Sequence, residues 1–330
     1  MGKNGQNGVK KIAVLSSGGD APGTNACIRA IVRVASERGM HVLGVSHGYQ
    51  GLLNGEIAPL TRRAVGNIIQ RGGTILGTSR CKDFTTPEGR AKAAAIIAEH
   101  KVDGLIVLGG DGSFRGAAAL SQEHGIPIMA VPTTIDNDMH GTDYTLGFDT
   151  AVNVALEAID RIRDTAESHE RIFFVEVMGH VCGAIALEVG VAGGADDVLV
   201  PEVDTDIDFL CEHLDKGFHH GRRSSIIVVA EGGETGGAFA IAHQVWRRLR
   251  YDYRVCVLGH IQRGGTPTAR DRVTGSKFGA LAVDTLAAGE SGLMVGEIGG
   301  KTCLTPLEQA FNGRRHADQS LLELARRLTR

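Results

Sequence analysis

Two carboxylates and two threonine hydroxyls are packed into one short segment, Val131–Asp138, which reads Val-Pro-Thr-Thr-Ile-Asp-Asn-Asp. Asp136 beside Thr134 could accept a proton from an attacking alcohol, because a carboxylate within reach of a hydroxyl can act as a general base. Asp138 could lie near a metal ion or a sugar hydroxyl. Clusters of Asp, Asn and Thr are more often plain surface turns, so this segment alone leaves both interpretations open.

Two glycine-rich turns, each expected between a strand and a helix, have the character of phosphate-binding loops. The first is Ser17–Gly23, Ser-Gly-Gly-Asp-Ala-Pro-Gly, and the second is Gly109–Ser113, Gly-Gly-Asp-Gly-Ser. Backbone N–H groups in such turns, with the positive end of the following helix, can hold a phosphate. In the second turn Asp111 offers a carboxylate to Mg²⁺. Each turn by itself can be explained by steric needs of the backbone or by helix capping. Two such turns in one half of the chain favour a polyphosphate site.

Basic residues at junctions between loops and strands supply positive charge for such a site. Arg80 ends the loop Gly72–Arg80, Arg171 and Arg254 each begin a predicted strand, and His260–Gly265 is a basic loop after the second of these strands. A single arginine at a strand end is often only a solvated charge. Four such positions beside two phosphate-type turns predict anion clamps for the substrate and the transition state.

Other chemistry is disfavoured by motifs that are incomplete or absent. Gly299-Gly300-Lys301-Thr302 resembles the end of a Walker A loop, but its first glycine would fall on Val295, and Pro306 stops a regular helix after it. No G-x-G-x-x-G opens a helix after a strand, which argues against a dinucleotide dehydrogenase. The sequence also has no G-x-S-x-G and no H-E-x-x-H, the common hydrolase and zinc-protease signatures.

Periodicity places these motifs on alternating strands and helices. Apolar runs predict strands at Lys11–Ser16, His41–Ser46, Gly104–Leu108, Ile126–Val131, Arg171–Val177, Val198–Val200, Ser225–Ala230 and Arg254–Leu258. Amphipathic runs predict helices at Thr24–Arg38, Arg62–Gln70, Pro87–His100, Phe114–Glu123, Gly147–Ser168 and Leu321–Leu328. This alternation is typical of an α/β protein with a doubly wound, mostly parallel sheet and reactive loops at its carboxyl edge.

Length and composition describe an ordinary globular enzyme. The 330 residues suffice for two α/β lobes, and Gly147–Ser168 is the expected entry to the second. A formal charge of −3 gives no reason to expect nucleic acid or a membrane as partner. The six cysteines show no C-x-x-C pair or zinc spacing, which predicts free thiols. Because Met1–Val9 has no apolar signal core, we expect a cytoplasmic protein.

Together these motifs resemble those of the bacterial-type 6-phosphofructokinase family, whose members use ATP or pyrophosphate. The resemblance runs from Lys11 to about Asp271 and rests on Ser17–Ala26, Gly72–Arg80, Gly109–Ser113, Thr134–Asp138, Gly141–Gly147, Glu176–Gly179 and Leu258–Gly265. It implies two Rossmann-like, three-layer lobes. Residues 1–147 with 262–312 would bind the phosphoryl donor, and residues 148–261 with 313–330 would bind fructose 6-phosphate.

The resemblance implies Mg²⁺-assisted phosphoryl transfer from ATP to the C1 hydroxyl of fructose 6-phosphate, which requires positioning and charge neutralisation more than covalent chemistry. Asp136 is the implied general base, and Thr134, Gly19 and His180 are the other implied catalytic residues. The implied acceptor site comprises Thr134, Asp136, Asp138, Arg171, Met178, Gly179, His180, Glu231, Arg254, His260 and Arg263, with Arg171 and Arg254 coming from a neighbouring subunit. The implied donor site comprises Gly19, Tyr49, Arg80, Cys81, Gly110, Asp111, Gly112, Ser113 and Gly116, with Asp111 at the metal.

Three positions bear on how the implied reaction would run. His180 stands where the family usually has an arginine that stabilises the transferring phosphoryl group, although a histidine can still donate a hydrogen bond. Gly112 favours ATP, because family members with aspartate at this position use pyrophosphate and a carboxylate would repel the α-phosphate. Thr133 is neither the lysine typical of pyrophosphate users nor the glycine frequent in ATP users.

The resemblance further implies a homotetramer with an allosteric anion site between subunits. The corresponding positions here are Arg29, Arg33, Arg62, Arg163 and Arg222, with Asp196 in place of a family glutamate and His220 in place of an arginine.

Three alternative functions stay open at this stage. One is a pyrophosphate-dependent phosphofructokinase. Another, motivated by His180, is a non-catalytic regulator that binds a nucleotide or sugar phosphate, although a positioned base at Asp136 argues against it. The last is a kinase for a different acceptor. The implied sugar-phosphate residues Glu231, His260 and Arg263 argue against it.

Overall fold

The structure, a computed structural model, describes residues 9–233 and 236–328 of the 330-residue chain. These residues form two compact units. Unit 1 comprises residues 9–134, 139–149 and 265–314, and unit 2 comprises the described residues of 135–138, 150–264 and 315–328. The chain therefore passes between the units several times, and each unit is described by itself.

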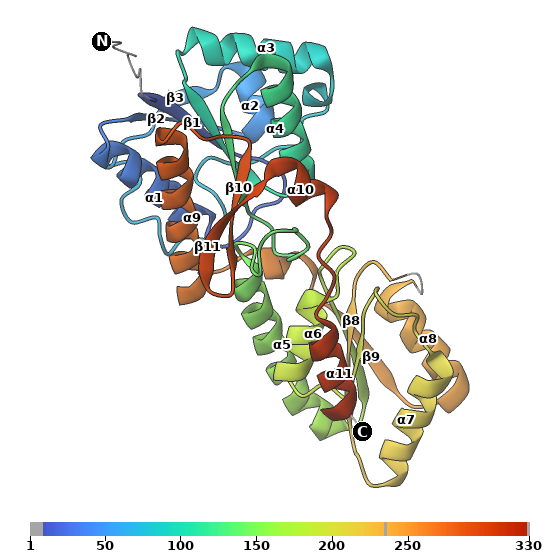
Figure 1. The fold of residues 1–330 in the computed structure, drawn as a ribbon. Helices are drawn as coiled ribbons and strands as arrows, with labels where there is room; N and C mark the ends of the chain where they lie inside the picture. The colour runs from blue at the N-terminus through green and yellow to red at the C-terminus, as the bar shows by residue number, and fades with distance from the viewer. Residues whose placement is uncertain (1–8, 234–235, 329–330) are drawn as a thin grey trace, which may run out of the picture. The chain divides into compact units, whose positions relative to one another are not determined.

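Unit 1 is built on a seven-stranded sheet (Figure 1). Its strands are β1 (Lys11–Ser16), β2 (His41–Val45), β3 (Ile57–Pro59), β4 (Gly104–Gly109), β5 (Ile128–Pro132), β10 (Leu293–Ile298) and β11 (Lys301–Pro306). They lie in the order β11-β10-β5-β4-β1-β2-β3. The five inner strands are parallel, and only the edge strands β3 and β11 run antiparallel to their neighbours. Helices on both faces bury the apolar runs of β1 and β4 completely.

Two hydrophobic cores flank this sheet. One contains apolar residues of α1 (Thr24–Glu37) and α9 (Ala269–Ala287), and the other those of α2 (Gly48–Asn54), α3 (Pro87–Glu99), α4 (Asp111–His124) and α10 (Leu307–Asn312), with the 3-10 turn η1 (Asp83–Thr85) beside them. Helices α1 and α9 approach closely because Gly279 of α9 has no side chain where it meets α1. A Cβ at Gly279 would lie 2.6 Å from the Cys27 carbonyl oxygen.

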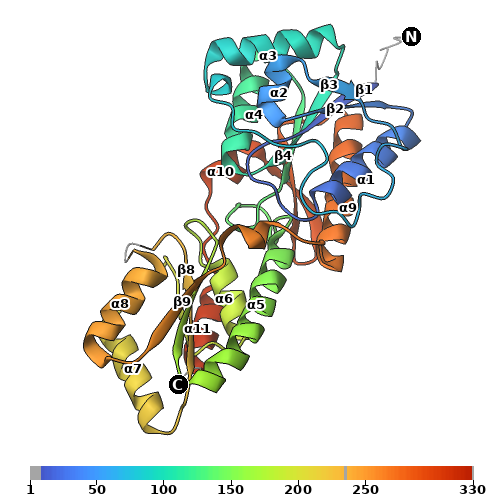
Figure 2. The ribbon, with the colours of Figure 1, turned by 180° about the vertical axis from the view of Figure 1, so that it is seen from behind.

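Unit 2 has a smaller, fully parallel sheet. Strands β6 (Ile172–Val177), β7 (Asp197–Leu199), β8 (Ser225–Ala230) and β9 (Tyr253–Val257) lie in the order β7-β8-β6-β9. Helices α7 (Ile207–His219) and α8 (Gly237–Leu249) form the core on one face. Figures 1 and 2 show α5 (Phe148–His169), α6 (Ala184–Ala192) and α11 (Gln319–Leu328) on the other. The 3-10 turn η2 (Gly259–Arg263) follows β9.

The predicted α/β architecture with mostly parallel sheets is confirmed, whereas one predicted helix and one predicted helix start are wrong. Residues 62–70 form turns instead of a helix. The reason is local: Asn67 adopts a left-handed conformation with φ 53°, and only Val65 and Ile68 of this run are buried. Helix α4 begins at Asp111, three residues before the predicted start at Phe114.

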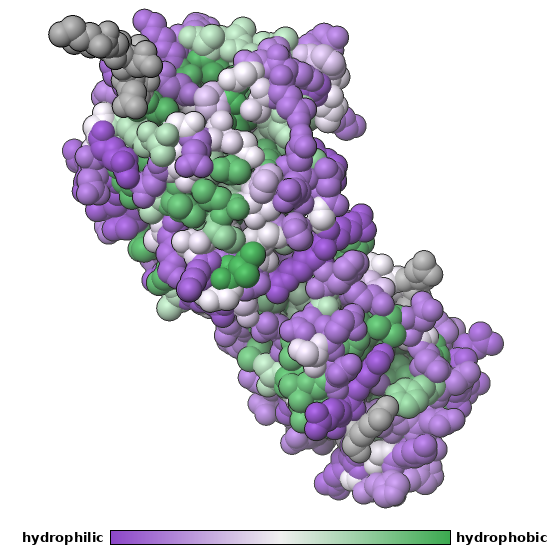
Figure 3. Space-filling view, in the orientation of Figure 1, coloured by the Kyte–Doolittle hydropathy of each residue, from purple (hydrophilic) through white to green (hydrophobic). Residues whose placement is uncertain are grey.

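Other features of the sequence are explained by local structure. Gly299 and Gly300 form the turn between β10 and β11, both with positive φ, so the Walker-like sequence continues into a strand. All six cysteines are free thiols. On the face shown in Figure 3 polar residues cover most of both units, and apolar residues form separate groups. Within residues 9–233 and 236–328, no helix has the length and apolar character needed to cross a membrane.

Candidate active site

The two glycine-rich turns of unit 1 lie against each other. They follow β1 and β4, which are neighbouring parallel strands, so both leave the same edge of the sheet. The Ser17 N–H donates to the Leu108 carbonyl at 2.9 Å. A Cβ at Gly109 would lie 2.6 Å from the Ser17 carbonyl oxygen, so the contact requires glycine. Exposed backbone at Gly18 and Gly19 therefore adjoins the second turn, which is what binding of a phosphate chain needs.

The second turn is itself the beginning of α4. Gly110 is the N-cap residue, without a side-chain capping hydrogen bond, and Asp111, Gly112 and Ser113 form the first helical turn. The N–H groups of a first turn lack intrahelical acceptors and carry the positive end of the helix dipole. A Cβ at Gly112 would meet no atom within 4 Å, whereas one at Gly110 would lie 3.8 Å from the Thr134 Cβ. Unit 1 thus brings Thr134 to an open helix N-terminus suited to an anion.

Two predicted donor-site residues lie beneath this turn. Tyr49 is buried, stacks on Phe84 with ring centroids 3.7 Å apart, and donates its hydroxyl to the Ser113 carbonyl at 2.7 Å. Burial raises the pKa of the Tyr49 phenol, so the hydroxyl stays protonated and keeps this bond. A Cβ at Gly116 would lie 3.0 Å from Phe84. Tyr49 and Gly116 therefore support the helix start from inside unit 1.

A buried amide that sequence reasoning missed holds the loop of residues 71–80. Asn25 Nδ2 donates to the carbonyls of Arg71 and Gly72 at 3.0 and 3.2 Å, and its Oδ1 accepts from the Ile75 N–H at 2.8 Å. The signal was present, since Asn25 stands on the apolar face of its helix, three residues before buried Ile28. A polar residue at such a position needs partners, and here they are loop backbone groups.

The same loop reaches the first glycine-rich turn at its far end. The Thr78 hydroxyl donates to the Gly18 carbonyl at 2.7 Å. Arg80 follows two residues later and is exposed, and Cys81 is half-buried. The loop therefore carries a cation close in sequence to a residue that contacts the phosphate-type turn.

The carboxylate predicted to bind Mg²⁺ is compatible with that role. Asp111 is exposed at the start of α4 and pairs with Arg115, Nε to Oδ2, at 3.2 Å. Arg115 also donates to the Phe311 carbonyl at 2.6 Å. The described residues contain no group of three or more His, Cys, Asp or Glu side chains that could hold a metal. A single carboxylate still fits Mg²⁺, which proteins often bind through one or two carboxylates together with substrate phosphates.

The carboxylate loop, residues 135–138, belongs to unit 2. Asp136 and Asp138 are half-buried, and Asn137 between them is buried with φ 53°. The Asp138 carbonyl accepts the Arg315 N–H at 3.1 Å. A left-handed residue turns the chain sharply and persists only where its surroundings fix it. The loop therefore holds two carboxylates in a fixed turn.

Glu231 fixes the turn Met178–His180 at the carboxyl edge of the second sheet. The Glu231 N–H continues the sheet to the Val177 carbonyl at 2.9 Å, and its Oε1 accepts the N–H groups of His180 and Gly179 at 2.9 and 3.3 Å. Gly179 has φ 147°, and a Cβ there would lie 2.3 Å from the Cys182 carbonyl oxygen. His180, with φ 57°, is exposed. One carboxylate oxygen thus orients the turn that presents His180.

The basic loop lies at the same edge. The Leu258 N–H donates to the Glu176 carbonyl at 3.0 Å, so η2 leaves β9 beside the end of β6. Within η2, His260 is exposed and Arg263 half-buried, while Gln262 is fully buried and donates to the Gly259 carbonyl at 3.1 Å. The structure therefore gathers the predicted sugar-phosphate residues Met178, Gly179, His180, Glu231, His260 and Arg263 at one edge of unit 2.

Two further predicted residues lie at the opposite edge of that sheet. Arg171 directly precedes β6, and Arg254 pairs with Phe173 near the start of β9. The six residues of β6 span roughly 20 Å at about 3.3 Å per residue. One chain therefore does not bring Arg171 and Arg254 to the edge that carries Glu231 and His260.

The predicted effector residues divide between the two units. Asp196 pairs with Arg222 at 3.0 Å and accepts the Ile226 N–H at 2.8 Å. Arg163 donates to the carbonyls of Gly193 and Gly194. A cavity of about 860 Å³ between α7, β7 and α11 is lined in part by Arg222. In unit 1, Arg29 and Arg33 are half-buried on α1, and Arg62 is exposed in the turns after β3.

The fold and loops define a class: an α/β protein of two units, each with parallel strands and loops suited to anions. The family model described as Phosphofructokinase matches residues 11–286. The chain belongs to the phosphofructokinase family.

Curated relatives and solved structures agree with this assignment. The chain is 55% identical over 96% of its length, and 98% of the relative, to ATP-dependent 6-phosphofructokinase 1 of Thermus thermophilus. It is 50% identical to the ATP-dependent 6-phosphofructokinase of Paenibacillus macquariensis, over 97% of this chain and 99% of that one.

Among solved structures, phosphofructokinase from Saccharomyces cerevisiae has a TM-score of 0.86 at 36% identity, over 92% of this chain and 45% of the yeast chain. A pyrophosphate-dependent phosphofructokinase from Marinobacter aquaeolei has a TM-score of 0.82 at 23% identity, over 96% of this chain and 91% of that one. The second likeness concerns the fold alone.

Proposed function

We propose that the chain is an ATP-dependent 6-phosphofructokinase, which transfers a phosphoryl group from ATP to the C1 hydroxyl of fructose 6-phosphate. The observation that carries the proposal is the 55% identity over 96% of the chain to a relative with that name. The geometry supports it in each unit: an open helix N-terminus beside two glycine-rich turns in unit 1, and gathered carboxylate, histidine and arginine side chains in unit 2.

Asp136 is the proposed general base. It takes the proton of the C1 hydroxyl as the oxygen attacks the transferring phosphoryl group, and Thr134, which lies next to Gly110, assists it. Asp138 contacts the sugar. Met178 and Glu231 bind the sugar, while His260 and Arg263 hold its 6-phosphate by charge-assisted hydrogen bonds. His180, presented by the turn that Glu231 orients, donates a hydrogen bond to the transferring group.

The donor binds against exposed backbone in unit 1. The N–H groups of Gly110–Ser113 and the Gly19 backbone receive the phosphates, and Arg80 neutralises their charge. Mg²⁺ bound by Asp111 and the donor phosphates would neutralise charge that develops during transfer. For this role Asp111 must share or leave its pair with Arg115.

Two side chains favour ATP over pyrophosphate as donor. Gly112 borders open space at the first turn of α4, so neither bulk nor charge opposes an α-phosphate there. Thr133, the ambiguous position, is buried and donates its hydroxyl to the Val131 carbonyl at 3.2 Å. Because the Thr133 side chain is turned into the protein, we assign donor choice to Gly112.

We further propose a homo-oligomer, a tetramer, in which Arg171 and Arg254 of one subunit complete the acceptor site of the next. Their position at the far edge of the second sheet supports this arrangement. The pair Asp196–Arg222, with Arg163, would form half of an effector site for an anion, and Arg29, Arg33 and Arg62 of another subunit the other half. We also propose a cytoplasmic location.

The test is an initial-rate assay with fructose 6-phosphate and Mg²⁺, in which aldolase-coupled detection reports fructose 1,6-bisphosphate. ATP and pyrophosphate are supplied separately. Turnover with ATP alone is the expected result. Turnover with pyrophosphate alone would assign the other donor, and no turnover with either would favour a non-catalytic binding protein.

A further inference from the structure

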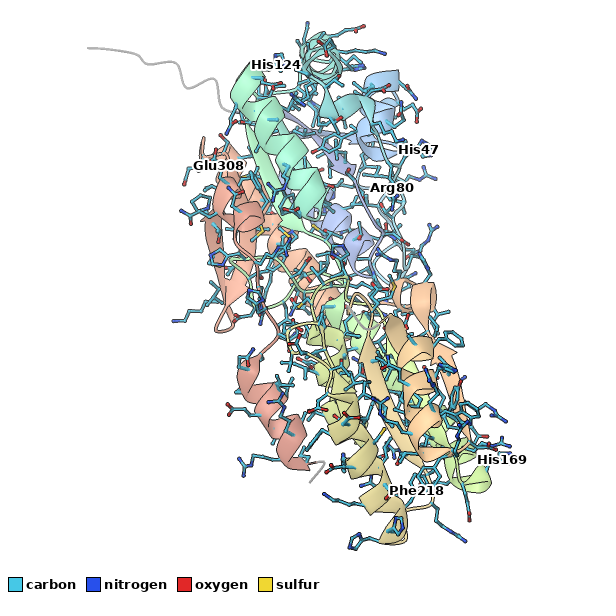
Figure 4. The ribbon with its side chains drawn as sticks, turned by 90° about the vertical axis from the view of Figure 1, so that its right-hand side faces the viewer. His47, Arg80, His124, His169, Phe218 and Glu308 are labelled. Carbon is cyan, nitrogen blue, oxygen red and sulfur yellow. The ribbon has the colours of Figure 1, made fainter. Side chains whose placement is uncertain are left out.

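A histidine and a glutamate outside the predicted site hold the loop that carries Arg80. His47 directly precedes α2, and its Nδ1 lies 2.6 Å from Glu56 Oε2. The second carboxylate oxygen of Glu56 accepts from Asn54 Nδ2 at 2.9 Å. The His47 N–H donates to the Leu76 carbonyl at 2.8 Å. One residue thus connects the carboxylate to the loop backbone, and Figure 4 shows His47 and Arg80 on the same side of unit 1.

The imidazole ring itself lies against the loop. A Cβ at Gly77 would be 3.0 Å from His47 Cδ2 and 3.4 Å from Nε2, so any larger residue at position 77 would displace the ring. Gly77 also has φ 64°, which glycine adopts without strain. Immediately after it, Thr78 donates to the Gly18 carbonyl at 2.7 Å. The segment 76–78 is therefore held by His47 on one side and by the first glycine-rich turn on the other.

The backbone conformation of His47 indicates that its surroundings hold this pair in place. Its φ of 56° lies in the left-handed region, where a residue other than glycine is strained and persists only when the surroundings fix it. The hydrogen bonds from His47 and Asn54 lower the pKa of the Glu56 carboxyl. Since an ionised carboxylate only accepts, the Nδ1 of His47 carries the donated proton.

We infer that the His47–Glu56 pair is a positioning element for the phosphoryl donor, because it fixes segment 76–78 and thereby both Arg80 and the Gly18–Gly19 backbone. This inference rests on the proposed function. A loop that is ordered before binding loses less conformational entropy when the donor binds. The pair should therefore act on donor affinity and leave the chemical step unchanged.

The test compares His47→Gly with His47→Asn, since both residues tolerate a left-handed backbone. Glycine removes the ring and the Nδ1 donor, whereas asparagine retains an N–H donor near the same place. We expect His47→Gly to raise the KM for ATP about fivefold, with kcat and the KM for fructose 6-phosphate within about twofold of wild type. His47→Asn should restore most of the ATP affinity. Arg248→Ala, which breaks the exposed pair with Asp208 in unit 2, is the matched control and should change none of these constants.

A second measurement is independent of activity. Amide hydrogen exchange at residues 76–80, without nucleotide, should quicken in His47→Gly and return toward wild type in His47→Asn. Faster exchange with an unchanged KM for ATP would show a purely structural pair and overturn the inference, as would equal KM values in both variants. If the wild type itself shows no turnover with ATP, the proposed function fails, and calorimetric Kd values for ATP then replace KM in the same comparison.

Discussion

Whether a polar side chain in this site can serve a ligand depends on which of its atoms already bind the protein. The Glu231 Oε1 accepts two backbone N–H groups, while its Oε2 has no protein partner among residues 9–233 and 236–328. One carboxylate therefore orients the His180 turn and keeps a second oxygen that can accept a hydrogen bond, as the proposed sugar site requires. Thr133 shows the opposite case, because its only hydroxyl points back to Val131.

Asp136→Asn tests the proposed base with almost no change in shape. Asparagine cannot accept the proton of the C1 hydroxyl, so we expect kcat to fall by about 10²- to 10⁴-fold while the KM for fructose 6-phosphate changes only a few-fold. Steady-state kinetics measure both constants. Asp143→Asn is the matched control: Asp143 accepts the Gly299 N–H at 2.7 Å in unit 1 and should leave kcat near wild type. Equal losses in the two variants would remove Asp136 from the role of base.

Gly112→Asp tests donor selection by charge. Because a Cβ at Gly112 meets no atom within 4 Å, aspartate and asparagine should both fit without displacing the protein. We expect Gly112→Asp to raise the KM for ATP by about tenfold or more through repulsion of the α-phosphate, whereas Gly112→Asn, equal in size but neutral, should raise it much less. If both variants weaken ATP binding equally, the size of the side chain at position 112 decides the donor, and the electrostatic account fails.

The sequence points to candidate residues on loops more readily than to the residues that hold those loops. Asp136, Asp111 and the glycine turns stand out because their types and spacing fit phosphate chemistry. Asn25 and His47 do not, since each holds its loop through contacts with residues far along the chain, Asn25 with Arg71 and His47 with Leu76. A folded chain is needed to see such contacts. Periodicity in the sequence carries no record of them.

At the scale of elements, apolar periodicity placed the predicted strands to within two residues, and the predicted helices α1, α3, α5 and α11 equally well. It started α4 three residues late and gave no bounds for α7, α8 or the 19-residue α9. It failed where local conformation overrides propensity: a left-handed Asn67 prevents a helix over 62–70. It also missed the hairpin of β10 and β11, whose strands complete the edge of the first sheet. The β10–β11 turn depends on two glycines with positive φ in a motif that resembles a nucleotide loop.

Helices α3 and α4 are joined by one charged pair, which should make stability depend on pH. Arg90 is buried and donates to both oxygens of Glu123, at 2.7 and 2.6 Å. The Arg90 hydrogen bond lowers the pKa of the Glu123 carboxyl below its unfolded value, which is about 4.3. A carboxyl group whose pKa is lower in the folded than in the unfolded protein contributes its full stabilisation of the fold above the unfolded pKa. This contribution is lost as the pH falls through the folded pKa.

We therefore expect Glu123→Gln to melt a few degrees below wild type at pH 7. The difference should stay constant down to about pH 5 and shrink below about pH 4, because wild-type Glu123 is then protonated as well. Thermal unfolding at four pH values between 7 and 3.5 measures it. Glu157→Gln removes an exposed pair with Arg161 on α5 and should give a small, flat difference. A Glu123→Gln difference that persists at low pH would assign the effect to packing.

At the scale of the whole molecule, the proposed acceptor site is incomplete within one chain. Arg171 and Arg254 lie at the amino edge of the second sheet, roughly 20 Å along β6 from the edge that carries Glu231 and His260. If the enzyme is a symmetric oligomer, a neighbouring chain can supply both arginines at once, since a two-fold contact is reciprocal. A chain that lacks Arg171 and a chain that lacks Asp136 should then form one intact site together.

Mixing Arg171→Ala with Asp136→Asn subunits should restore activity, although each variant alone is nearly inactive. In a mixed pair, the chain with intact Asp136 receives Arg171 from its neighbour, so on the order of a quarter of wild-type sites are rebuilt in a random mixture of paired chains. Initial rates after subunit exchange, verified by native mass spectrometry, measure the recovery. Mixing Arg171→Ala with Arg254→Ala is the matched control, because each rebuilt site would still receive one defective arginine from its neighbour. No recovery in the test mixture would show that Arg171 serves its own chain. Recovery in the control mixture would show that the two arginines of one site come from different chains.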